Sequence, residues 1–231
     1  MIHKTLTIMN IKIKKRGKLN MGNIIEHIDS IIFDLDGTLW DSTNEVVTSW
    51  NLVMNKYDNE KKEITVEELK GYMGLPLEEI RKKMLPDMDE EEAKNLMTEC
   101  CEIENKYLRN HGARLYDNLE ETLKELSKKY KLFIVSNCQD GYIEAFLEYH
   151  NFYKYFKDFE CPGKSNLLKD ENIKLIIERN HLKNPIYVGD TQTDCDAAKK
   201  AGIPFVFAKY GFGNVNEYEN FIDKFEDLLA L

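Results

Sequence analysis

Residues 30–41 read SIIFDLDGTLWD, an apolar run that ends abruptly in two carboxylates, a glycine and a hydroxyl. The run Ser30–Phe33 is short and lacks polar alternation, as expected of a parallel strand that is covered on both faces. Asp34 and Asp36 then fall where this strand leaves the sheet, and the two-residue period of a strand places them on the same side. Two crowded carboxylates repel each other unless a cation or a shared proton relieves them, and an oxygen-only pair suits magnesium. The stretch therefore predicts a chemical site, although Asp-Gly is also a common turn.

Composition limits the class of protein. The 231 residues carry a formal charge of −9 and are 42% hydrophobic, which is enough for one good core and a small second one. No apolar run approaches the length of a membrane span, and the acidic charge argues against a nucleic-acid partner. Five cysteines without a Cys-x-x-Cys pair, and histidines without metal-ligand spacing, predict a reduced cytoplasmic protein with no zinc site.

Three segments of different character follow one another along the chain. A basic cluster within residues 1–22, with no apolar segment after it, predicts a flexible N-terminal extension rather than a secretory signal. Residues 42–115 contain capping-box signatures and apolar residues at helical spacing, and there we expect helices and no strand. We expect residues 23–41 and 116–231 to form the main core, and residues 42–115 to form a separate helical domain.

From residue 116 onward, predicted strands alternate with predicted helices. The strands are residues 132–137, 156–161, 185–190 and 203–208, and the helices are residues 119–130, 142–150, 172–180 and 194–201. This alternation predicts an α/β fold with a doubly wound parallel sheet.

Three of the predicted strands end in a polar side chain, namely Asp34, Ser136 and Asp190. In open α/β sheets, ligands bind beyond the carboxyl ends of the strands, where the strand order reverses. Each residue alone has another interpretation, because Ser136 can start a turn and Asp190 can precede a helix cap. Their common position after buried strands favours one shared site.

Together, these motifs resemble those of the haloacid dehalogenase-like (HAD) phosphohydrolases. That family has Asp-x-Asp-Gly-Thr after one strand, Ser or Thr after a second, a lysine, and Gly-Asp-x-x-x-Asp after a third; the matching stretches here are residues 34–38, 136 and 189–194. The helical insertion resembles the cap of the phosphoglycolate phosphatase and β-phosphoglucomutase branch. The resemblance implies a Rossmann-like HAD core with a smaller, all-helical cap domain inserted after the first strand.

The resemblance also implies a role for each site residue. Asp34 would be the nucleophile that forms an aspartyl-phosphate, and Asp36 would be the general acid and base. Magnesium would be held by Asp34, the backbone carbonyl of Asp36 and Asp190, with Asp194 in support. Ser136, Asn137 and a lysine would bind the phosphate.

Two lysines are candidates for the phosphate-binding position. Lys169 directly precedes the start of a helix, where the family's lysine usually stands, whereas Lys164 lies in a Pro-Gly loop that we expect to be flexible. The chain lacks the Lys-Pro-x-Pro form that is often found there, so Lys164 stays an alternative. We predict Lys169.

These features predict a magnesium-dependent phosphatase that acts on a small phosphorylated metabolite, as a monomer or a small homo-oligomer. One alternative is a β-phosphoglucomutase-like phosphomutase on the same core, which would need a cap that excludes water. An alternative of another class is a catalytically idle regulatory or binding protein. Retention of both aspartates argues against the idle protein. The resemblance implies that the cap selects the substrate, so the motifs of the core do not identify the metabolite.

Overall fold

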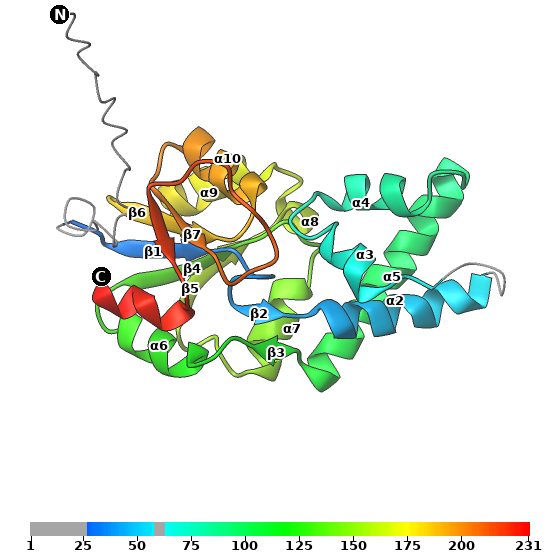
Figure 1. The fold of residues 1–231 in the computed structure, drawn as a ribbon, viewed down its shortest axis with the longest axis horizontal. Helices are drawn as coiled ribbons and strands as arrows, with labels where there is room; N and C mark the ends of the chain where they lie inside the picture. Colours follow the sequence, from blue (N-terminus) through cyan, green and yellow to red (C-terminus); the bar gives the residue numbers. More distant parts are fainter. Residues whose placement is uncertain (1–26, 58–62) are drawn as a thin grey trace, which may run out of the picture.

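A six-stranded parallel sheet lies at the centre of the fold (Figure 1), in the order β5-β4-β1-β6-β7-β8. The structure is a computed structural model that describes residues 27–57 and 63–231. The chain leaves β1 toward β4 and β5 on one side and later continues with β6 to β8 on the other, so the strand order reverses at β1. The strands are β1 (Ser30–Phe33), β4 (Lys131–Val135), β5 (Phe156–Glu160), β6 (Pro185–Gly189), β7 (Phe205–Ala208) and β8 (Asn220–Ile222).

The central strand is buried on both faces because its side chains alternate between two apolar clusters. Ile31 and Phe33 belong to the larger cluster and Ile32 to the other, and all three are fully buried. An apolar run without polar alternation is what such a two-sided position requires. β1 therefore holds the residues that follow it in a fixed place at the middle of the sheet edge.

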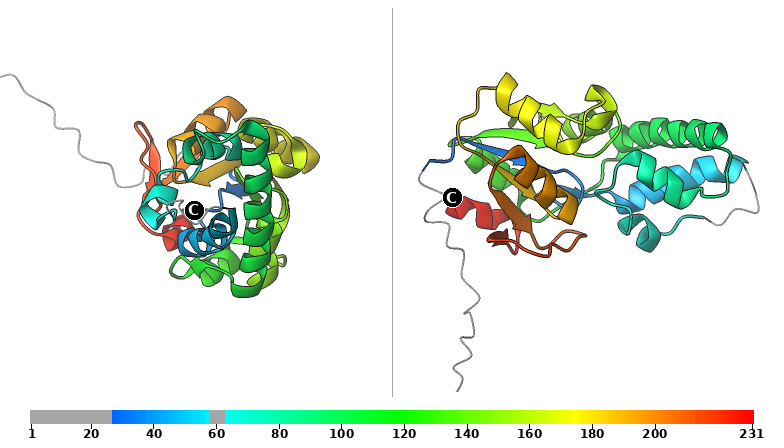
Figure 2. Two further views of the ribbon diagram at one scale, coloured as in Figure 1. Left: turned by 90° about the vertical axis from the view of Figure 1, so that its right-hand side faces the viewer. Right: turned by 90° about the horizontal axis from the view of Figure 1, so that it is seen from above.

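Helices cover both faces of the sheet, as the two turned views in Figure 2 show. α9 (Lys169–Arg179) and α10 (Gln192–Ala201) contribute to the cluster around Ile32, whereas three other helices contribute to the cluster around Phe33. These three are α6 (Leu119–Leu126), α7 (Tyr142–Tyr149) and the 3₁₀ helix η1 (Phe225–Ala230). This arrangement confirms the predicted α/β class with a doubly wound parallel sheet.

Four helices form a second unit, called here the helical unit, at the end of the sheet where the strands finish (Figure 1). They are α2 (Thr43–Tyr57), α3 (Val66–Lys70), α4 (Leu77–Met84) and α5 (Glu90–His111). They share a buried apolar cluster of their own, which includes Trp50, Leu69 and Leu96. The division of the chain into domains at residues 42 and 115 stays a prediction.

The expectation of no strand between residues 42 and 115 is wrong at one point. Arg114–Leu115 forms β3, which pairs antiparallel with β2 (Trp40–Asp41). Two residues are too few to produce a periodic signal in the sequence. The ribbon joins the chain entering the helical unit to the chain leaving it.

Short elements account for the other differences from the sequence prediction. β8, η1 and α8 (Pro162–Ser165) were not predicted, and α8 lies where we expected a flexible loop. The predicted extension over residues 1–22 lies outside the described residues. Within the part of the chain that the structure describes, no helix is long and apolar enough to span a membrane.

Candidate active site

Asp34 extends β1 by one residue and lies buried at the middle of the sheet edge. Its backbone N–H donates to the carbonyl of Val188, 2.9 Å away, which continues the ladder with β6. Its side chain is 4% exposed, and Oδ1 lies 2.7 Å from Nζ of Lys169. Burial raises the pKa of Asp34 to about 7, and the positive charge of Lys169 acts in the opposite direction. The charge of Lys169 therefore favours the ionised form of this carboxylate.

Lys169 is the first residue of α9, and it contacts the carboxylates of both Asp34 and Asp194. Burial alone would lower its pKa, but the two acids outweigh that effect and raise the pKa. Lys164 is exposed, and its ammonium group lies 5.0 Å from the ring centroid of Phe159. Of the two lysines considered from the sequence, the structure thus brings Lys169 to Asp34.

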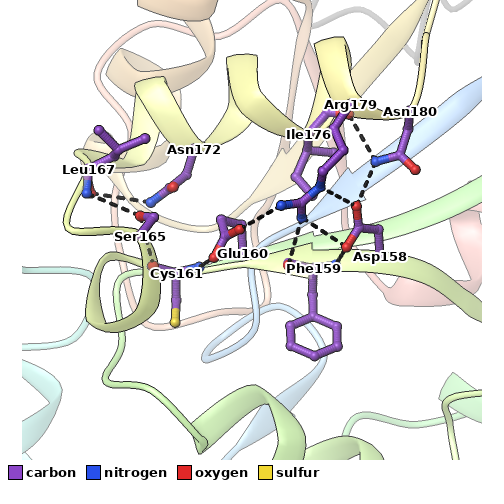
Figure 3. A network of polar contacts seen from close by, with 10 residues as sticks. All are labelled: Asp158, Phe159, Glu160, Cys161, Ser165, Leu167, Asn172, Ile176, Arg179 and Asn180. Carbon is purple, nitrogen blue, oxygen red and sulfur yellow. Dashed lines mark hydrogen bonds and ion pairs between the residues drawn. The ribbon is translucent and has the colours of Figure 1, made fainter.

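Hydrogen bonds of Arg179, the last residue of α9, hold this helix against β5 (Figure 3). The guanidinium group of Arg179 donates to both carboxylate oxygens of Asp158, at 2.8 and 2.9 Å, and to Oε2 of Glu160 at 3.0 Å. At the other end of α9, the side-chain amide of Asn172 donates to the carbonyl of Leu167 at 3.2 Å. A buried lysine that pairs with two acids needs this kind of fixed support.

Asp36 has different partners from Asp34. Its Oδ1 accepts hydrogen bonds from the hydroxyl groups of Ser42, at 2.6 Å, and Tyr142, at 2.9 Å. Tyr142 also lies 2.9 Å from Ser42, so the three residues form a closed triangle. Burial raises the pKa of Asp36 to about 6, against the lowering effect of these two donors. A carboxyl group with such a pKa can both give and take a proton near neutral pH.

Asp190 and Asp194 complete an acidic cluster with Asp34, in which one oxygen from each residue lies within 4.8 Å of the others. Oδ2 of Asp194 accepts from the backbone and the hydroxyl of Thr191 and from the backbone of Asp190. Oδ2 of Asp190 accepts from the backbone N–H of Phe212, but Oδ1 is buried without a hydrogen-bond partner among the described residues. Burial, with the charges of Asp194 and Asp34, raises the pKa of Asp190 well above its usual range.

The cluster fits a divalent cation. A buried carboxylate oxygen without a donor costs free energy unless a cation or a proton satisfies it. The donor set is all oxygen, which suits magnesium. Both oxygens of Asp194 are engaged, by hydrogen bonds and by Lys169, so Asp194 can orient Asp190 and Lys169, whereas Asp34 and Asp190 could offer oxygens to an ion.

Gly37 is required by the close approach of the loop after β1 to Asp190. Its φ is +81°, a conformation that favours glycine, and a Cβ atom there would lie 2.2 Å from Oδ2 of Asp190. Gly37 therefore allows the loop after β1 to lie against Asp190, which follows β6.

The predicted phosphate-binding residues follow β4. Ser136 is buried beside this edge of the sheet, and the side-chain amide of Asn137 donates to the carbonyl of Gly74 in the helical unit, at 3.1 Å. The backbone N–H groups of Leu35, Asp36 and Asn137 have no acceptor within the described residues. Unpaired backbone donors beside a buried carboxylate are suited to binding phosphate oxygens.

Asp34, Asp36, Ser136 and Asn137 line a cavity, called here the chamber, which lies between the core and the helical unit. Its other walls are largely apolar and come from the helical unit; they also include Glu104, Gln139 and Tyr142, which sequence analysis missed as site residues. For Glu104 a signal existed, because it occupies a core position of α5, between Cys100 and Leu108 at four-residue spacing.

Comparison with known proteins agrees with this geometry. The family model for haloacid dehalogenase-like hydrolases matches residues 31–208. The chain belongs to this family. The match spans the four aspartates, Ser136, Asn137 and Lys169, and it confirms the resemblance that the motifs indicated.

Similar proteins in this family include phosphatases. A phosphoglycolate phosphatase of Vibrio parahaemolyticus is 25% identical over 82% of this chain and 87% of its own length. One of Aquifex aeolicus is 27% identical over 80% of this chain and 87% of its own length. Together with the family match, they confirm the predicted enzyme class, a HAD-like phosphoric monoester hydrolase.

Solved structures support the fold. A haloacid dehalogenase-like hydrolase of Bacteroides fragilis superposes with a TM-score of 0.77 at 23% identity, covering 87% of this chain and all of the other. A haloacid dehalogenase-like family protein of Streptococcus pneumoniae gives a TM-score of 0.72 at 22% identity, covering 88% and 97%.

Proposed function

We propose that this HAD phosphatase requires magnesium and hydrolyses a small phosphomonoester through an aspartyl-phosphate on Asp34. The observation that carries the proposal is the position of Asp34, which is buried, paired with Lys169 and next to the unpartnered Oδ1 of Asp190. Asp36 provides a second acid in the same chamber. A nucleophile, a general acid and a phosphate-binding surface are thus within one small volume.

In the first step, a carboxylate oxygen of Asp34 attacks phosphorus, and the bond from phosphorus to the ester oxygen breaks. The leaving alkoxide takes a proton from Asp36, whose carboxyl group is positioned by Ser42 and Tyr142. Lys169 and the unpaired backbone N–H groups stabilise the charge on the transferring phosphoryl oxygens.

In the second step, Asp36 accepts a proton from water as the water attacks phosphorus, and the aspartyl ester bond breaks. Inorganic phosphate leaves and Asp34 is restored as a carboxylate. The same carboxyl group serves as acid and then as base, which its pKa of about 6 allows.

Magnesium would be held by Asp34, the backbone carbonyl of Asp36 and Asp190, while Asp194 orients this set through Thr191. When bound, the ion neutralises charge on the phosphoryl oxygens and orients the phosphate for in-line attack. Calcium prefers more ligands and a looser geometry, so it would be a poor substitute.

We propose a small phosphorylated metabolite as the substrate, because the chamber is enclosed between the core and the helical unit, with apolar walls and a few polar groups. The helical unit would act as the cap that closes over this metabolite and excludes water. All five cysteines are free and buried, which supports a cytoplasmic enzyme. We propose a monomer or a small homo-oligomer.

A screen of small phosphomonoesters, with detection of released phosphate, tests the proposal. We expect turnover that requires magnesium, is abolished by a chelator and is lost in Asp34→Asn, whose amide is a poor nucleophile. Asp36→Asn should also fail in steady turnover, but it should accumulate phospho-enzyme from an ester with a good leaving group. Isomer formation without phosphate release would indicate the phosphomutase, and full activity in Asp34→Asn would remove the proposed nucleophile.

A further inference from the structure

Glu104 is a buried acid on the chamber wall to which the reaction gives no role. Its Oε2 accepts hydrogen bonds from the indole N–H of Trp50, at 2.8 Å, and from the side-chain amide of Gln139, at 3.1 Å. Within residues 27–57 and 63–231, no donor reaches its other oxygen, Oε1. The residue is 3% exposed and lines the same cavity as Asp36. An acid kept at such a position offers an acceptor to whatever occupies the chamber.

Positive charge is missing from this part of the site. None of the described residues that line the chamber is a lysine, an arginine or a histidine. Arg81 and Lys94 line the neighbouring cavity, but Arg81 is held by two hydrogen bonds to Glu78, and Lys94 pairs with Glu90 at 2.7 Å. Lys169 is bound to Asp34 and Asp194. The wall around Glu104 therefore has no free cation with which to bind a second anionic group.

The available donors on this wall are also in use. Trp50 and Gln139 both donate to Glu104, and the hydroxyl of Tyr142 donates within the triangle with Asp36 and Ser42. A substrate carboxylate would have to displace these bonds. Its negative charge would also lie near Asp36 with no cation beside it, and this cost remains when Glu104 is protonated.

A hydroxyl or an ammonium group on the substrate, unlike a carboxylate, can donate a hydrogen bond to Glu104 and adds no negative charge. A hydroxyl both donates and accepts, so it pairs with Oε1 in either protonation state of Glu104, and an ammonium group pairs with the carboxylate. With the phosphate at Asp34, the alcohol part of the ester lies beside Asp36, which protonates its oxygen, and extends toward the wall that contains Glu104.

We infer that Glu104 recognises the alcohol part of the substrate, and that the enzyme selects phosphomonoesters whose alcohol carries a hydroxyl or ammonium group and no carboxylate. This inference rests on the proposed phosphatase function. It separates the chain from the phosphoglycolate phosphatases it resembles, since phosphoglycolate carries a carboxylate in its alcohol part.

The test compares kcat/KM for glycerol phosphate, phosphoethanolamine, phosphoglycolate and ethyl phosphate in wild type, Glu104→Gln and Glu102→Gln. Glutamine keeps the shape of Glu104 and an acceptor for Trp50, and exposed Glu102 on the same helix is the matched control. In the wild type, we expect the first two esters to exceed phosphoglycolate by about tenfold or more. In Glu104→Gln, assayed above pH 8 where Glu104 of the wild type is ionised, phosphoethanolamine should lose about tenfold or more, while ethyl phosphate stays within about threefold.

Three outcomes would overturn the inference. Phosphoglycolate could be the best of the four esters in the wild type. Glu104→Gln could lower kcat/KM equally for all four, which would assign Glu104 a purely structural role between the helical unit and the core. Absence of turnover on every ester, with p-nitrophenyl phosphate included, would instead overturn the proposed function, and the inference with it.

Discussion

Lys169 reduces the repulsion between two carboxylates in a buried site, because its ammonium group contacts both Asp34 and Asp194. Removing one member of a buried ion pair leaves an uncompensated charge, which typically costs about 3–5 kcal/mol. The stability and the chemistry of the site therefore depend on the same side chain.

Lys169→Met should lower turnover roughly a hundredfold or more, because methionine keeps much of the stem but removes the charge near the transferring phosphoryl group. The parallel variant Lys164→Met should cost little, since Lys164 is exposed and lies over Phe159. Rate measurements on both variants, with thermal melts to check folding, decide the assignment. A large loss at Lys164 with a near-normal Lys169→Met would reverse it.

The burial of Glu104 predicts that the free energy of unfolding depends on pH. Burial raises its pKa to about 8, whereas a glutamate in an unfolded chain titrates near about 4.3. Between these values the unfolded chain releases the proton while the folded protein keeps it. The free energy of unfolding should therefore fall as pH rises through this window, by about 1.4 kcal/mol per pH unit from this group.

Glu104→Gln should remove that contribution, so the variant should gain stability relative to wild type as pH rises from 5 to 8. Denaturant unfolding at several pH values measures the difference, and Glu102→Gln should follow the wild-type curve. Parallel curves for wild type and Glu104→Gln would show that Glu104 is ionised in the folded protein.

At the scale of elements, α9 connects the surface of the core to the active site. Its first residue is Lys169, and its last, Arg179, binds Asp158 and Glu160 on β5 (Figure 3). Glu160 is 3% exposed, so loss of its partner leaves a buried acid without its charge pair. The position of a site residue thus depends on contacts at the far end of its helix.

Arg179→Ala should lower the free energy of unfolding by about 1.5–3 kcal/mol, the usual range for hydrogen bonds to charged groups. It should also lower kcat, because α9 no longer holds Lys169 firmly. Lys174→Ala is the control, since it removes an exposed pair with Asp170 on the same helix and should change stability by less than about 1 kcal/mol. Equal effects of the two substitutions would contradict this account of α9.

Elements with strong periodicity were predictable from sequence, and short ones were not. α7 was predicted over residues 142–150 and spans Tyr142–Tyr149, since its apolar residues recur at helical spacing. β3 and α8 were missed because two to four residues carry no period, and tertiary pairing decides them. Asp34 and Asp190 were proposed for the site because strand ends meet at one edge of a sheet. Tyr142 was missed because only tertiary packing brings α7 to Asp36.

At the scale of the whole molecule, the chamber exists only because the helical unit lies against the core. The β2–β3 ribbon pairs the two segments that connect the core with the helical unit. Side-chain hydrogen bonds from Asn137 to Gly74 and from Gln139 to Glu104 also join the two units at the chamber. Residues of both units therefore enclose the chamber, and a small change where they meet should alter catalysis more than folding.

Gly74 tests this dependence because it lies where the helical unit meets the core. Its φ is +81°, and a Cβ atom there would lie 2.8 Å from Cγ2 of Thr191, the residue that caps α10. Gly202 is a matched control, since its φ is +77° and a Cβ atom there would meet nothing within 4 Å. Alanine at either position should cost about 1–2 kcal/mol of stability, the penalty for a side chain in the left-handed region.

Only Gly74→Ala should also affect catalysis, because its methyl group pushes the helical unit away from Thr191 and from the acidic cluster that Thr191 supports. We expect kcat/KM to fall roughly ten- to hundredfold, the scale of a misplacement of about 1 Å at a reacting centre. Gly202→Ala should keep kcat/KM at the wild-type value. Equal kcat/KM in the two variants, measured with the best ester of the screen, would mean that the helical unit does not need this close approach for turnover.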